Sequence, residues 1–190
     1  MTDSARPASA VSELDLRTAA FAQLYAARGW SAPERDFFAD EAIIWSRFVG
    51  FLDGLGPGDW TAAVAKSDAG GPDWTVLDHV AHIAAWEAFG LDYVVRALDG
   101  EPWPTDESIG DFDTFNEAQR AQWAGRSATD VRAWVAEARE RLLPALRRVP
   151  PDVLHSEAVF GWTFFLVHGH VLDHMAMLGP WFERRREASR

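Results

Sequence analysis

Apolar residues recur at intervals of three and four along most of the chain, which is the period of amphipathic helices. The pattern predicts helices over residues 12–28, about 34–55, about 75–98, 111–124, about 128–148 and 163–186. No run of five or more residues alternates between apolar and polar positions with enriched β-branched side chains. We therefore expect no strand and an all-α chain.

Local signals suggest where these helices begin and end. Ser31 with Pro33 in the first turn is expected to start the second helix, since Ser favours the N-cap and Pro the first helical positions. Thr75 or Asp73 can cap the third helix. Gly179–Pro180 is expected to bend or interrupt the last helix, because Pro lacks a backbone donor.

Four of the predicted helices are long, and two long connections separate them, which favours a four-helix bundle. The chain has 190 residues, enough for one domain but cramped for two. Residues 1–10 are polar and small and predict a disordered tail, leaving residues 11–190 as a single domain. The helix Ser12–Arg28 is then an extra N-terminal helix.

Composition excludes several classes of function. The net charge of −11 disfavours binding to nucleic acid or to anionic membrane surfaces. The chain has no cysteine, which excludes disulfides, thiolate metal sites and a cysteine nucleophile. It also has no apolar run long enough to span a bilayer, so a cytoplasmic location is expected by default. Hydrophobic residues make up 48% of the chain, enough for a sizeable core.

Five of the six histidines lie in two apolar segments, residues 73–87 and 167–178. The last helix has a core seam with spacing 4, 3, 4, 3, 4, 3, formed by Phe160, Phe164, Val167, Val171, His174, Leu178 and Trp181. His170 precedes His174 by four residues, so both side chains leave the same face and could reach one metal ion. His168 points away from this face and is expected on a flank or at the surface.

The third predicted helix offers further histidines. His79 and His82 both lie on its apolar face, and either could supply a third ligand. Taken singly, each is better interpreted as a core histidine. Taken together, burying three imidazoles without partners is costly, and a metal would satisfy them jointly. Three neutral histidines leave a coordination position open, where water with a lowered pKa could act as nucleophile.

The carboxylates near these histidines are weaker candidates for metal ligands. Glu87 follows His82 by five residues, about 140° around the helix, so it is not expected to bind the same ion. Asp40 and Glu41 could approach the site if their helix faces it.

The segment 74–87, with Thr75, Asp78 and the Ala81-His82 step, resembles the signature of the DinB-like superfamily. This superfamily includes the ClbS/DfsB group, the YfiT-like proteins and the mycothiol-dependent maleylpyruvate isomerases. Residues 169–174 resemble the His–x₃–His pair on its last helix, and residues 113–117 give a looser match. The resemblance covers about residues 36–187 and implies a four-helix bundle.

The resemblance implies a ligand set of His82, His170 and His174, with His79 in the second shell or the core. It implies a divalent metal, most often nickel or zinc, and often a homodimer. It does not name one reaction.

Three hypotheses of function follow. The first is a metal-dependent hydrolase or thiol transferase acting on a small electrophilic substrate. Its nucleophile would be metal-bound water or a low-molecular-weight thiol of the mycothiol or bacillithiol type, since the chain has no cysteine. The second is a bundle that binds or sequesters a small molecule without catalysis. The third is a structural protein whose histidines are core residues.

Overall fold

The computed structural model describes residues 36–64, 73–105, 108 and 110–188. The predicted tail 1–10 and helix 12–28 lie outside the described residues. The division into a tail and one domain therefore stays a prediction.

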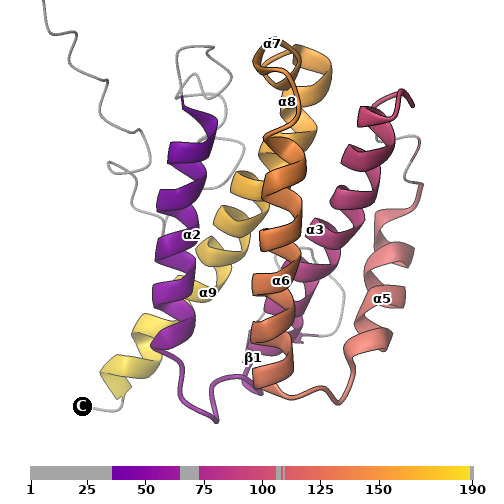
Figure 1. Cartoon of the computed structure of the whole chain (residues 1–190). Helices are drawn as coiled ribbons and strands as arrows, with labels where there is room; N and C mark the ends of the chain where they lie inside the picture. The colour runs from indigo at the N-terminus through magenta and orange to yellow at the C-terminus, as the bar shows by residue number, and fades with distance from the viewer. Residues whose placement is uncertain (1–35, 65–72, 106–107, 109, 189–190) are drawn as a thin grey trace, which may run out of the picture.

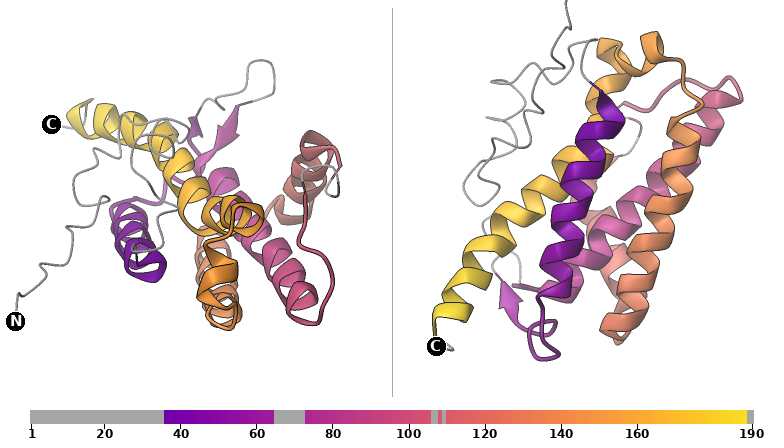
Figure 2. Two further views of the ribbon diagram at one scale, coloured as in Figure 1. Left: turned by 90° about the horizontal axis from the view of Figure 1, so that it is seen from above. Right: turned by 60° about the vertical axis from the view of Figure 1, so that its left-hand side comes forward.

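Helices dominate the described chain (Figure 1). Its elements are α2 (Phe37–Asp53), β1 (Ala63–Val64), β2 (Trp74–Thr75), α3 (Val76–Leu98), α5 (Phe112–Trp123), α6 (Ala128–Leu146), α7 (Pro151–Leu154), α8 (Glu157–Phe164), the π-helix η2 (Phe165–Gly169) and α9 (His170–Ala188). The long helices α2, α3, α6 and α9 lie side by side, as the view from above in Figure 2 also shows. The predicted all-α four-helix bundle is confirmed.

The predicted helix starts are partly confirmed. Thr75 caps α3, and its side chain and that of Asp78 form a reciprocal capping box. The predicted start at Ser31 and Pro33 lies outside the described residues, within which α2 begins at Phe37. The side chain of Asp36 accepts a hydrogen bond from the backbone of Ala39 there, and a carboxylate suits this positive end of the helix.

The C-terminal helix runs without a break through α8, η2 and α9. The predicted interruption at Gly179–Pro180 is wrong, because Pro180 lies inside α9. Leu178 is fully buried and Trp181 packs against the core, and this packing outweighs one lost backbone hydrogen bond. The irregular turn lies earlier in the helix, at η2, where the sequence contains no proline and no pair of glycines that would predict it.

A two-stranded antiparallel sheet was not predicted, since each strand has only two residues. Ala63 pairs with Thr75, and Val64 pairs with Trp74. Strand β2 ends at Thr75, which is also the N-cap residue of α3. It also buries Trp74 with its ring centroid 4.8 Å from that of His82.

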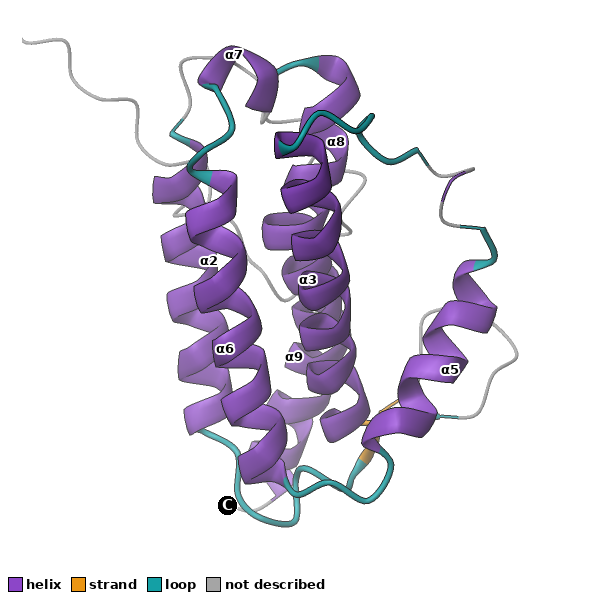
Figure 3. Ribbon diagram, turned by 45° about the vertical axis from the view of Figure 1, so that its right-hand side comes forward, coloured by secondary structure: helices purple, strands orange, loops and turns teal. Residues whose placement is uncertain are grey.

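The core lies among the four long helices and contains Ile44, Phe48, Ile83, Leu142 and Leu172. In contrast, α5 stands to one side, against one end of α3 (Figure 3). No helix in the described part of the chain is long and apolar enough to cross a bilayer.

Helix α3 packs closely on η2 at Gly90. A Cβ atom built there would lie 2.4 Å from Leu166 Cδ1, and Leu166 is itself buried in the core. We expect Gly90→Ala to lower the free energy of unfolding by about 1–3 kcal/mol through overpacking. Gly50→Ala is the control, since no atom lies within 4 Å of its Cβ, and it should stabilise α2 by up to about 1 kcal/mol. Chemical denaturation measures both, and effects of equal sign would contradict the close contact.

Candidate metal centre

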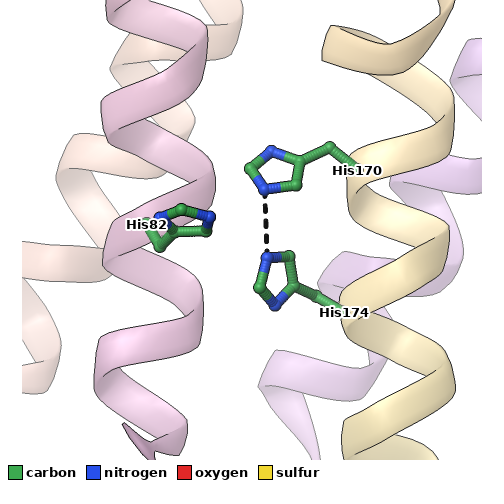
Figure 4. A group of neighbouring side chains, drawn as sticks. All are labelled: His82, His170 and His174. Atoms are coloured by element: carbon green, nitrogen blue, oxygen red, sulfur yellow. Dashed lines mark hydrogen bonds between the residues drawn. The ribbon is translucent and has the colours of Figure 1, made fainter. Parts of the chain in front are cut away.

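Three histidine side chains meet between α3 and the C-terminal helix (Figure 4). His82 comes from α3, and His170 and His174 come from successive turns of α9. Their exposed fractions are only 6%, 3% and 5%, respectively. One ring nitrogen from each lies within 4.8 Å of the others. The structure therefore brings together all three residues that the sequence singled out.

The spacing of these nitrogens fits one shared ion. His170 Nε2 lies 3.0 Å from His174 Nε2. Two nitrogens bound to one ion at about 2.0–2.1 Å lie roughly 2.9–3.4 Å apart. Imidazole nitrogen is also a donor that zinc and nickel accept well. The donor set and its spacing thus suit a divalent transition metal.

The protonation state suits coordination too. Burial lowers the pKa of His170 to about 3, since an imidazolium is poorly solvated there, and the cation of Arg139 and the ring of His79 add to this effect. His170 is therefore neutral at pH 7, which is the form that binds metal.

His79 lies one turn before His82 on α3 and is fully buried. Its Nδ1 is 2.9 Å from Nδ1 of His174, so one ring donates a hydrogen bond to the other. This contact fixes the ring of His174 while its Nε2 faces His170. The burial of His79 agrees with the expectation of a core residue, and a role in orienting a metal ligand stays a prediction.

His168 is not on a flank or at the surface, so that prediction is wrong. Only 1% of it is exposed, and its Nε2 lies 2.9 Å from the backbone oxygen of Phe37. Its ring also meets the Phe37 ring edge to face. The reason is that the C-terminal helix has neighbours on both sides, with α3 on one and α2 on the other.

Aromatic rings from α3 and η2 lie against His170. Phe165 stacks on His170 with ring centroids 5.0 Å apart, and Trp86 meets His170 at 6.2 Å. The Trp86 indole N–H donates to Asn116 Oδ1 on α5 at 3.0 Å. The three histidines are almost fully buried, and low exposure to solvent strengthens electrostatic interactions among such groups.

A buried ionic cluster lies between α2, α3 and α6. Arg139 on α6 places its guanidinium 3.0 Å from Glu87 Oε1 and 3.6 Å from Glu41 Oε1. Burial raises the pKa of Glu87 to about 7 and also raises that of Glu41, although Arg139 opposes both shifts. Glu87 thus faces Arg139, which agrees with the expectation that it does not share a face with His82.

Arg139 was not recognised from the sequence, although a signal existed. It follows Val135 by four residues and precedes Leu142 by three, so it occupies a core position on α6. A charged residue at such a position usually needs a buried partner.

Comparison with known proteins agrees with this fold. The sequence model of the mycothiol maleylpyruvate isomerase N-terminal domain matches residues 42–163. The match contains His82 but ends before His170 and His174. No curated protein matches the chain. A crystal structure of an uncharacterised protein from Escherichia coli UTI89 is similar with a TM-score of 0.68 and 12% identity, over 79% of this chain and 92% of that one. At this identity the likeness shows the fold alone.

The raised pKa of Glu87 predicts a pH-dependent stability. Below about pH 4.5 Glu87 is protonated in both the folded and the unfolded chain. As the pH rises from there through 7, Glu87 ionises more readily in the unfolded chain, so the stability that the protonated side chain contributes is lost. We expect Glu87→Gln to remove about 1–3 kcal/mol of this decline between pH 4.5 and 8. Urea denaturation across that range measures it.

Glu137→Gln is the matched control, since Glu137 lies on α6 with a largely exposed side chain. It should leave the decline unchanged. Equal pH dependence in the wild type and in Glu87→Gln would contradict the assignment.

Proposed function

Because the chain belongs to the family of mycothiol maleylpyruvate isomerase N-terminal domains, within the DinB-like superfamily, we propose that it is a divalent-metal enzyme. In this proposal it transfers a low-molecular-weight thiol of the mycothiol or bacillithiol type to a small electrophilic substrate. The observation that carries the proposal is the convergence of three buried histidines from two helices. The match to the family of mycothiol maleylpyruvate isomerase N-terminal domains supports a low-molecular-weight thiol as the cosubstrate.

His82, His170 and His174 would hold the metal, with nickel or zinc best suited to three imidazoles. When bound, the metal would lower the pKa of a thiol or water at its open position and so supply a nucleophile. The chain contains no cysteine, so the thiol must be a cosubstrate.

The surrounding residues would support this chemistry in two ways. His79 would hold the His174 ring in place through the 2.9 Å contact between their Nδ1 atoms. Trp86 and Phe165 would exclude bulk water on the side of His170. Homodimerisation, which the resemblance implies, stays a prediction.

We expect the purified protein to carry about one divalent ion per chain, as three-histidine sites do. The double variant His170→Ala/His174→Ala should lose this ion, measured by elemental analysis after dialysis. His168→Ala is the control: it also removes a buried imidazole, but one that contacts Phe37 instead of the cluster. It should lose stability and keep the metal.

A wild-type protein that holds no metal, and whose stability does not respond to a chelator, would refute the site. The close contacts among His79, His174 and His170 would then be a hydrogen-bonded chain within the core.

The thiol is tested by calorimetry with mycothiol and the metal-loaded protein. Binding should be lost in the double variant and weakened for S-methylated mycothiol, which cannot offer a thiolate. Equal binding of both compounds would argue against a thiol at the metal. Turnover of an electrophile in water alone would instead indicate a hydrolase.

A further inference from the structure

We propose that Arg139 is a positioning residue that holds the π-helix η2 open at Val167, and thereby sets the direction of His170 and His174. The consequence for metal binding rests on the proposed function. The structural part concerns the protein without metal and can be tested separately.

The π-helix comes directly before the two histidines. It spans Phe165–Gly169, and α9 begins at His170. A π turn is wider than an α turn and disturbs the regular pattern of backbone hydrogen bonds. The Val167 carbonyl accepts a hydrogen bond from Arg139 Nη1 at 3.1 Å, and the Arg139 side chain is 3% exposed. A side chain from α6 thus satisfies a backbone group of the irregular turn.

This turn sets the rotation of everything after it. Each residue of an α-helix turns about 100°, and a π turn accommodates one extra residue. If η2 became regular, the side chains of α9 would rotate by about that angle relative to α8. His170 and His174 would then no longer point toward His82, as they do in Figure 4.

Arg139 is itself fixed from two other helices. Its guanidinium meets Glu87 of α3 at 3.0 Å and Glu41 of α2 at 3.6 Å. Its Cζ also lies 4.4 Å from the ring centroid of Trp45 on α2. A guanidinium presents five donors in one plane, so it can bind carboxylates and a carbonyl together, and a lysine ammonium cannot reproduce this fork. Arg139 therefore ties the irregular turn to the rest of the bundle.

The test uses a triple variant, Glu41→Gln/Arg139→Met/Glu87→Gln, which removes the donor to Val167 without leaving a buried carboxylate unpaired. Replacing a whole buried ionic cluster by neutral residues is often tolerated. The control is Arg132→Met, which removes another arginine of α6 that donates to a backbone carbonyl, that of Leu52, and leaves the bond from Arg139 to Val167 in place.

In the folded triple variant without metal, we expect amide hydrogen exchange over residues 165–171 to quicken about tenfold, the effect of losing one hydrogen bond from a charged donor. Affinity for Zn²⁺, measured by competition with a chelator, should fall by about 10–100-fold. The Arg132→Met control should stay near the wild type in both measurements. Unchanged exchange and affinity in the folded triple variant would overturn the proposal, as would equal losses in the control.

Should the triple variant fail to fold, Arg139→Lys keeps the charge and removes the fork. We expect it to alter the visible spectrum of the Co²⁺-loaded protein, which reports how the imidazoles are arranged, and a wild-type spectrum would overturn the proposal. If the wild type binds no metal, the proposed function fails. Hydrogen exchange over residues 165–171 still decides the role of Arg139.

Discussion

The structure depends on burying a group of polar rings in a helical core. His79, His82, His170 and His174 are each at least nine-tenths buried, and they come from two helices that must face each other in one register. A buried imidazole is costly unless its nitrogens find partners. The contacts of 2.9 Å and 3.0 Å made by the two nitrogens of His174 show how closely the rings share this environment. The position of α3 against α9 is therefore fixed by polar contacts as well as by apolar packing.

The buried histidines have aromatic neighbours, and a separate ionic cluster lies elsewhere in the core. Around His170 the neighbours are aromatic, with Phe165 stacked on its ring and Trp86 at its edge. Between α2, α3 and α6 lies the ionic cluster of Glu41, Glu87 and Arg139. Such a cluster contributes little net stability, because desolvation offsets most of the attraction. Its value is geometric, since it joins three helices to the carbonyl of Val167.

Helical periodicity predicted most of the fold and the pairing of His170 with His174, whereas the choice of His82 over His79 came from the family resemblance. The capping box at Thr75 and the four-residue spacing of His170 and His174 depend only on residues close in sequence, and both features are present in the structure. His168 was misjudged because periodicity gives the direction of a side chain but not the number of neighbours around its helix. The π-helix was missed because the hydrogen bond that supports it comes from Arg139, 28 residues away. Arg139 itself could have been found, since it interrupts the apolar stripe of α6.

The ionic cluster also bears on the chemistry of the histidines. Glu87 is the carboxylate on α3 that follows His82 by little more than one turn, and its side chain is held by Arg139. The proposed ligand set would thus consist of three imidazoles, which would leave the charge of a divalent ion uncompensated. A cation held by these buried histidines would favour an anionic ligand at its open position, because little solvent would screen its charge. In the proposed function a thiolate would meet that requirement, and in a chain without cysteine it would come from a second molecule.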